Sequence, residues 1–367
     1  MKEGWEYKKL GEVCDIINGK NQKAVEDPDG KYPIMGSGGV MGYANNYLCK
    51  EGTTIIGRKG TINKPIYVNC KFWNVDTAFG LQPKEETNNK FLYYLCKSIN
   101  FEQYNKSVTI PSLVKSDLLK IGVHIPNNKI QESVVSELDL LSGVIEKQKT
   151  QLEELDKLAQ SIFYDMFGDP VTNEKGWELK KMQDVSEITS SKRIFANEYI
   201  EDGIPFYRGK EITERSKGQD LSLELYISKE RYEEIKKEFG VPAIGDILIT
   251  AVGTIGNIWV VNDINPFYFK DGNIIWVKEI KNINPTYFKR VLTILIAAYK
   301  SEMANGCAYS ALTIVNLKKM IFALPPLSLQ QEFAAKVEAI EAMKAKVRQS
   351  LKEAETLFNE RMDYYFN

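Results

Sequence analysis

The chain has 367 residues, of which 48 are Lys or Arg and 49 are Asp or Glu, so its formal net charge is −1. This length is sufficient for two domains with sizeable cores, and a content of 43% hydrophobic and 26% charged residues is typical of a globular protein. The composition argues against intrinsic disorder and against a protein that binds nucleic acid through bulk positive charge.

Membrane, secretory and metal-dependent classes are also disfavoured. The longest apolar run, residues 291–298, is far shorter than the roughly 20 residues that cross a bilayer. Residues 1–13 mix both charges without an apolar signal core. The five cysteines form no CxxC pair, and His124 is the only histidine, which argues against Ser-His-Asp catalysis and against a metal cluster. We therefore expect a cytoplasmic chain with reduced thiols, no metal and no cofactor.

The sequence contains an internal repeat. Residues 4–16 read GWEYKKLGEVCDI, and residues 176–188 read GWELKKMQDVSEI, an offset of 172. The segment GTTIIGRKGTI at 52–62 resembles GDILITAVGTI at 245–255, an offset of 193. At an offset of 199, four residues of the first copy match residues of the same type in the second: Leu113, Leu118, Pro126 and Gln131 match Leu312, Leu317, Pro325 and Gln330. Two copies of one unit, the second lengthened by insertions, explain these matches.

Each copy begins with a domain of mixed α+β class, which we call a head. The heads are expected at residues 1–127 and 176–326. Short β-branched and aromatic runs bounded by Gly, Asn and Asp predict strands, and apolar stretches that follow them predict helices. The predicted strands are Thr53–Ile56, Pro65–Val68, Ile247–Ala251, Ile258–Val261 and Asn273–Val277, and the predicted helices are Lys90–Ile99 and Pro285–Tyr299.

Each copy ends in a long helix, expected at residues 128–168 and 327–367. Both segments follow a proline, contain none, and carry apolar residues at alternating spacings of 3 and 4, a heptad seam. At about 1.5 Å per residue, each helix is about 60 Å long. The seam residues are Leu138, Leu141, Ile145, Leu152, Leu155 and Ile162 in the first helix, and Val337, Ile340, Val347, Leu351 and Phe358 in the second. We expect the two stripes to bury each other in an antiparallel coiled coil with pseudo-twofold symmetry.

Charge is unevenly distributed between these segments. The first head has 17 basic and 13 acidic side chains, a net charge of +4, whereas the second head has a net charge of +1. Local groups of Lys, Arg, Asn and Thr beside glycines suit nucleic-acid contact, because these side chains reach phosphates and base edges. The candidate DNA-binding residues are Lys20, Asn21, Lys23, Arg58, Lys59 and Lys64 in the first head, and Lys192, Arg193, Arg208, Lys210, Thr254, Asn257 and Ser310 in the second. For any one cluster taken alone, a solvated loop is the alternative interpretation.

The arrangement of two variable heads, each followed by a long helix, resembles the specificity subunit of type I restriction-modification enzymes. The resemblance spans residues 4–367. The segments that carry it are GWEYKKLGEV and GWELKKMQDV, YPIMGSGGVMGY with GRKGTINKPIY and FWNVDTAF, IPSLVKSDLLKIGVHIP, and ALTIVNLKKMIFALPPLSLQQEF. The first copy departs from the pattern where its long helix begins, with IPNNKIQE in place of LPPLSLQQE.

The resemblance implies a non-catalytic subunit. Its heads would be target recognition domains, each reading one half of a bipartite site in double-stranded DNA. Its helices would set the spacer and dock two methyltransferase subunits, to which motor-nuclease subunits are added. The alternatives are a coiled-coil scaffold whose heads bind peptides, an orphan DNA-binding subunit without a nuclease, and a self-contained enzyme that methylates or cuts DNA. The last is disfavoured because methyl-donor and nuclease motifs are missing.

Overall fold

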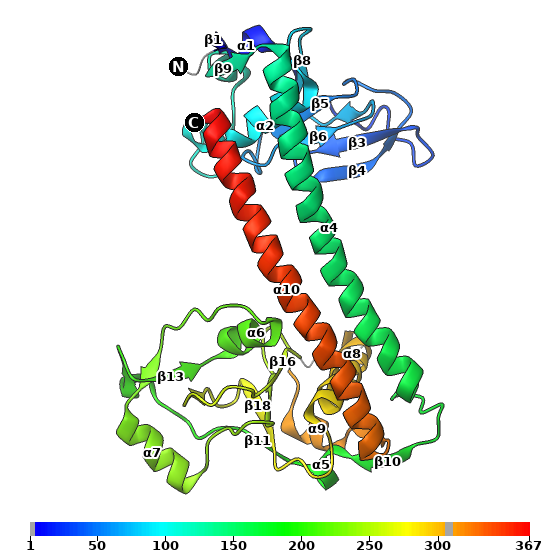
Figure 1. Cartoon of the computed structure of the whole chain (residues 1–367), viewed down its shortest axis with the longest axis vertical. Helices are drawn as coiled ribbons and strands as arrows, with labels where there is room; N and C mark the ends of the chain where they lie inside the picture. The colour runs from blue at the N-terminus through cyan, green and yellow to red at the C-terminus, as the bar shows by residue number, and fades with distance from the viewer. Residues whose placement is uncertain (1–3, 305–310) are drawn as a thin grey trace. The chain divides into compact units, whose positions relative to one another are not determined.

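The computed structural model describes residues 4–304 and 311–367 (Figure 1). The chain forms two compact units. One consists of Met1–Gln151 with Val347–Asn367, and the other of Leu152–Lys346. Each unit contains one head and parts of both long helices, α4 (Asn128–Phe167) and α10 (Leu327–Phe366).

The first head begins and ends in a two-stranded ribbon, in which β1 (Trp5–Lys9) pairs antiparallel with β9 (Gly122–Pro126). Its four-stranded sheet has the order β2 (Cys14–Asn18), β8 (Ala78–Pro83), β5 (Thr53–Gly57), β6 (Ile66–Val68), and its three-stranded sheet has the order β4 (Gly39–Ala44), β3 (Tyr32–Gly36), β7 (Trp73–Asn74). The helices are α1 (Leu10–Val13), α2 (Asn89–Ser98), the 3-10 turn Phe101–Tyr104 and α3 (Lys115–Leu118). Buried residues of α2, such as Phe91 and Leu95, share one core with Ile56 and Leu81 of the larger sheet.

The second head repeats this plan. Its ribbon pairs β10 (Glu178–Lys181) with β19 (Ile321–Leu324). One sheet has the order β11 (Glu187–Thr189), β18 (Ile274–Lys278), β15 (Ile247–Thr250), β16 (Ile258–Val260), and the other β12 (Tyr199–Ile200), β14 (Tyr226–Ile227), β13 (Ile204–Tyr207), β17 (Tyr268–Phe269). The helices are α5 (Met182–Val185), the 3-10 turn Ala196–Glu198, α6 (Gly209–Lys217), α7 (Lys229–Glu238), α8 (Pro285–Ala304) and α9 (Ile314–Lys319).

The internal repeat is visible in individual hydrogen bonds. The Leu113 N–H donates to the Arg58 carbonyl (2.9 Å), and in the second head the Leu312 N–H donates to the Ala251 carbonyl (3.1 Å). One sheet in each head contains a parallel pair: β3 pairs with β7 in the first head, and β13 pairs with β17 in the second. Helices α6 and α7 are inserted between strands of the second head, which accounts for the growth of the offset from 172 to 193.

A buried glutamine near the start of each long helix ties that helix to its head. Gln131 Oε1 accepts from the Asn88 N–H (2.8 Å), and Gln131 Nε2 donates to the Pro126 carbonyl (2.9 Å). In the second unit, Gln330 accepts from the Asn284 N–H (2.9 Å) and donates to the Pro325 carbonyl (2.8 Å). Asn88 and Asn284 in turn accept from backbone N–H groups in the first turns of α2 and α8. Because Gln131 and Gln330 make equivalent hydrogen bonds, the repeat extends to the junction between head and helix.

The two long helices pack antiparallel within each unit. In the first unit, Glu137 of α4 pairs with Arg361 of α10 (2.9 Å), and Gln148 donates to Ser350 (2.6 Å), so the residue numbers run in opposite directions. In the second unit, Lys344 of α10 pairs with Asp156 of α4 (2.7 Å). The α+β fold with two long helices packed together is therefore confirmed.

All the predicted seam residues are buried or half-buried. Leu138, Ile145, Ile340 and Phe358 are buried, and the other seam residues are half-buried. In the first unit, Leu138 and Ile145 share a core with Phe358 and with residues of the first head. In the first unit, the seam therefore continues into the core of the head.

Candidate nucleic-acid interface

Several loops of the first head converge at one end of its four-stranded sheet. Strands β2 and β5 end there, at Asn18 and Gly57, and the antiparallel β8 between them begins there, at Ala78. Backbone hydrogen bonds hold the loops together: the Lys20 N–H donates to the Asn74 carbonyl (2.9 Å) and the Arg58 N–H to the Thr77 carbonyl (2.8 Å). We call this region, residues 18–23, 57–64, 74–77 and 105–112, the first loop face.

The basic residues predicted from the sequence come together on the first loop face. The side chains of all six candidates are exposed: Lys20, Asn21, Lys23, Arg58, Lys59 and Lys64. None of the five cations has an ion pair with another residue of the described part of the chain. The Arg58 guanidinium makes only a long hydrogen bond to the Asp76 carbonyl (3.4 Å) and lies 5.8 Å from the centre of the Phe79 ring. These charges are available to an anionic partner such as DNA phosphate.

A glycine opens the turn between the basic residues. Gly60 has φ of +78°, a left-handed conformation that favours glycine, and no atom lies within 4 Å of the position a Cβ would take. Gly253, its counterpart at the offset of 193, has φ of +73° and equally open surroundings. The same exposed turn is therefore built in both heads, with room for a partner to approach the backbone.

Sequence reasoning missed the segment 105–112 of the first loop face. The Gly60 N–H donates to the Pro111 carbonyl (2.9 Å), so this segment lies beside the basic turn. It presents the exposed apolar side chains of Val108 and Ile110. The repeat carries a signal for this segment, because Ser310, a predicted contact of the second head, corresponds to Pro111 at the offset of 199. Ser310 itself lies outside the described residues.

The second head has an equivalent region at the matching end of its sheet, where β11 and β15 end and β18 begins. We call residues 190–193, 208–213, 251–257 and 270–273 the second loop face. Lys192, Arg193 and Thr254 are exposed, and Asn257 is half-buried. Arg193 pairs with Asp271 (2.8 Å), and the Lys192 ammonium lies 4.7 Å from the centre of the Phe239 ring.

Helix α6 belongs to the second loop face. Asn257 Nδ2 donates to Thr213 Oγ1 of α6 (3.0 Å), and the Thr213 and Thr254 hydroxyls are 3.4 Å apart. The first residue of α6, Gly209, also lies against Thr250 at the end of β15. The predicted residues Arg208, Lys210, Thr254 and Asn257, which are scattered along the sequence, are thus gathered on one face.

The cations at the start of α6 are paired with acids. Arg208 Nη2 donates to Glu211 Oε1 (2.7 Å) and to Glu224 Oε2 (3.0 Å), and Lys210 Nζ lies 2.5 Å from Glu224 Oε1. Hydrogen bonds from Lys210 and Arg208 hold the pKa of Glu224 below its ordinary value, and the bond to Glu224 raises the pKa of Lys210. The second loop face therefore differs from the first, because its own carboxylates neutralise part of its positive charge.

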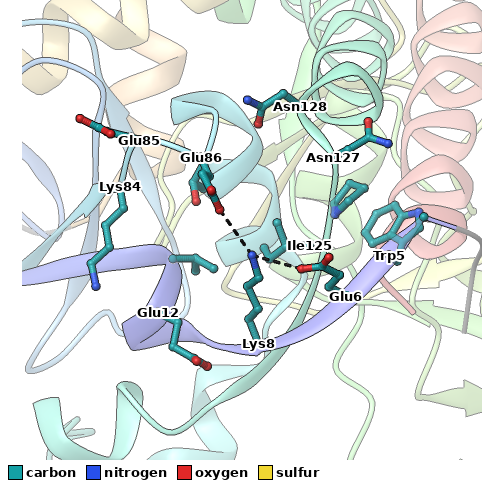
Figure 2. A pocket seen from close by; sticks show the side chains of 14 residues that line it. Trp5, Glu6, Lys8, Glu12, Lys84, Glu85, Glu86, Ile125, Asn127 and Asn128 are labelled. Carbon is teal, nitrogen blue, oxygen red and sulfur yellow. Dashed lines mark ion pairs between the residues drawn. The ribbon is translucent and has the colours of Figure 1, made fainter.

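The first head also has a cavity of about 840 Å³ that none of the predicted residues lines. Figure 2 shows its side chains, which come from β1, from α1, from residues 84–87 and from the end of β9 with the two asparagines that follow it. Lys8 pairs with Glu6 (3.3 Å) and Glu86 (3.6 Å), and Glu12 and Glu85 add further negative charge. A lining with more carboxylates than ammonium groups repels phosphate, so this cavity is not part of the candidate interface.

Neither a metal centre nor a membrane-spanning helix is found in the described part of the chain. Residues 4–304 and 311–367 contain no group of three or more His, Cys, Asp or Glu side chains that could hold a metal ion. Among the same residues, no helix combines the length and apolarity needed to cross a membrane. His124 is an exposed residue of β9, with its ring 5.6 Å from that of Tyr7. The loop faces are thus the main candidate sites of the described chain.

Comparison with known proteins identifies the family. The family model described as "Type I restriction modification DNA specificity domain" matches residues 2–157 and 174–355. A Haemophilus influenzae protein whose assigned name is that of a type I restriction enzyme specificity subunit is 28% identical over 371 residues, covering 98% of this chain and 94% of the relative. The MjaIX specificity subunit of Methanocaldococcus jannaschii is 24% identical over 389 residues, covering 93% and 87%.

A solved structure has the same fold. The type I restriction-modification S subunit from M. genitalium superposes with a TM-score of 0.64 at 17% sequence identity, covering 99% of this chain and 96% of the other. The family match accounts for both halves of the repeat. The chain therefore belongs to the type I restriction-modification DNA specificity family and is the non-catalytic specificity subunit of such a system.

Proposed function

We propose that the two heads are target recognition domains, residues 1–127 and 176–326, and that each reads one half of a bipartite site in double-stranded DNA. The observation that carries this proposal is the repeated loop face: each head places a glycine turn and basic or amide side chains at the same end of the same sheet. A bipartite site follows naturally from two similar reading surfaces in one chain, as it does for dimeric DNA-binding proteins.

The residue-level proposal keeps the candidates predicted from the sequence. In the first head they are Lys20, Asn21, Lys23, Arg58, Lys59 and Lys64, and in the second Lys192, Arg193, Arg208, Lys210, Thr254, Asn257 and Ser310. The unpaired cations of the first loop face suit phosphate contact, because each phosphate contact exchanges a DNA counterion for a Lys or Arg. The arginines have donors for base edges, and Asn257 has both a donor group and an acceptor.

We further propose that the helices, residues 128–168 and 327–367, set the spacer between the half-sites and dock two methyltransferase subunits. Motor-nuclease subunits would join through these, in the cytoplasm, where the DNA lies. The helices keep apolar side chains exposed after the seam is formed: Leu140, Val144 and Leu158 on α4, and Met343 and Leu357 on α10. Exposed apolar groups on a helix are a common feature of protein interfaces.

Hydroxyl-radical footprinting tests the bipartite claim. The full chain in complex with its methyltransferase subunits is used to select genomic fragments by binding, and the bound fragments are footprinted. The proposal predicts two protected segments separated by a less protected spacer of constant length. A single continuous footprint would contradict two reading heads. No protection by a complex that assembles normally would favour a scaffold.

A further inference from the structure

Glu224 lies beside the second loop face and contacts two of its cations. It lies in the irregular segment 219–225 between α6 and β14, and its side chain is 52% exposed. Each of its oxygens accepts from a different predicted DNA contact, Oε1 from Lys210 and Oε2 from Arg208. A carboxylate bound by an Arg and a Lys makes the same charge-assisted contacts that a DNA phosphate would make.

The second acidic partner of Arg208 has a different role. Glu211 is 1% exposed and accepts from both the Arg208 backbone N–H (2.7 Å) and Arg208 Nη2 (2.7 Å). These bonds fix the start of α6 and the direction of the guanidinium. Arg208 therefore remains oriented when Glu224 leaves, which makes Glu224 the exchangeable partner and Glu211 the anchor.

The two heads differ in this respect. Arg58 and Lys59 of the first loop face have no carboxylate partner within the described residues, whereas Arg208 and Lys210 share one. The first head is thus ready for phosphate in its free state. In the second head, phosphate must first displace a carboxylate of the protein itself.

We propose that Glu224 is a built-in competitor for DNA phosphate that weakens the grip of the second head on DNA. This inference rests on the proposed function of the second loop face. In free protein, Glu224 neutralises Arg208 and Lys210. When DNA binds, a phosphate replaces the Glu224 carboxylate, and the half-exposed Glu224 side chain turns away from Arg208 and Lys210 into solvent.

The test compares two charge-matched variants of the full chain, assembled with its methyltransferase subunits. Glu224→Gln removes the competitor. Glu234→Gln removes an exposed carboxylate of the same head that pairs with Arg231 on α7 (3.0 Å), so it controls for the change in net charge. Kd is measured by fluorescence anisotropy over a range of salt concentrations, on a 40-base-pair duplex taken from a footprinted fragment. Lys210→Gln is measured in parallel.

The proposal predicts that Glu224→Gln tightens binding about fivefold at low salt, because solvent-exposed ion pairs are weak and the displaced carboxylate therefore costs the DNA only a modest part of its affinity. It also predicts that log Kd becomes steeper in log salt by about 0.9, the value for one additional effective charge. Glu234→Gln should leave both quantities unchanged. Wild-type binding by Glu224→Gln, with weaker binding by Lys210→Gln, would overturn the competition while keeping the DNA contact. Wild-type binding by both variants would overturn the competition and also remove the second-head contact on which it rests.

Discussion

The glutamine that joins each head to its long helix gives the sharpest stability prediction. Gln131 is 1% exposed and Gln330 is 0% exposed. Gln131 makes three close hydrogen bonds to the backbone, to the Pro126 and Glu86 carbonyls and from the Asn88 N–H, whereas Gln330 makes two, to the Pro325 carbonyl and from the Asn284 N–H. Replacement by Met keeps the approximate volume and removes every one of these bonds.

The magnitude follows from the groups left behind. A buried backbone group that loses its partner costs about 1–3 kcal/mol. In each variant one buried carbonyl, that of Pro126 or of Pro325, loses its partner, so Gln131→Met and Gln330→Met should each destabilise the protein by about 1–3 kcal/mol. Gln148→Met is the matched control, because Gln148 is only half-buried and donates to an exposed Ser350 side chain. It should cost less than about 0.5 kcal/mol.

The assay is urea unfolding at 25 °C, followed by far-ultraviolet circular dichroism. The slope of the free energy of unfolding against urea concentration is compared between variants. A loss below about 0.5 kcal/mol in both Gln131→Met and Gln330→Met would refute the reasoning, because the buried backbone groups would then have found other partners. A loss of similar size in Gln148→Met would also refute it, since the effect would then not belong to the junctions.

Three further predictions concern other parts of the chain. Arg58→Gln should relax base preference in one half-site only, and it should lower the slope of log Kd against log salt by about 0.9. Binding is measured with duplexes in which either half-site is scrambled. Equal effects on both halves would contradict the assignment of Arg58 to one head. Lys344→Met should leave the free energy of unfolding unchanged or raise it, because the Lys344 side chain is only 8% exposed and an apolar replacement needs no partner. A loss above about 1 kcal/mol would instead show that the ion pair between Lys344 and Asp156 is net stabilising. A maleimide at pH 8 should modify the exposed Cys70 and spare Cys14, because burial raises the pKa of the Cys14 thiol to about 12. Peptide mass mapping identifies the modified cysteines, and modification of Cys14 in the folded protein would contradict the packing of the core.

The architecture was predictable from the sequence because its signals are local and repeated. The Gly-Trp segments mark the starts of β1 and β10, and the alternating spacing of 3 and 4 marks α4 and α10 over 40 residues each. Such long periodic patterns arise because one face of each helix is buried against the other helix over many turns.

The second head was less predictable where insertions enlarge it. Strands β12, β14 and β17 are two residues long, too short for any alternation of polar and apolar residues to show. They are held by tertiary contacts, such as the buried cluster that joins Phe206, Ile227 and Tyr268. Propensity alone does not identify such strands.

The sequence was sufficient to predict which residue types form the candidate site. It was not sufficient to predict which of its cations are paired with carboxylates. The sequence indicates that Arg208 and Lys210 could reach DNA, but their shared partner Glu224 follows 16 and 14 residues later, respectively, beyond α6. No spacing rule joins residues across such a loop. The pairing arises from the fold, and it distinguishes the two loop faces more than their net charges do.

Methylation mapping tests the central claim most directly. Genomic DNA is mapped after co-expression of this chain with its methyltransferase subunit, and again with the methyltransferase subunit alone. The account predicts one split motif with a fixed spacer that is methylated only when this chain is present. If the two proteins co-purify and no new methylated motif appears, the chain does not direct the methyltransferase in that complex, and the DNA contacts proposed for both heads lose their basis.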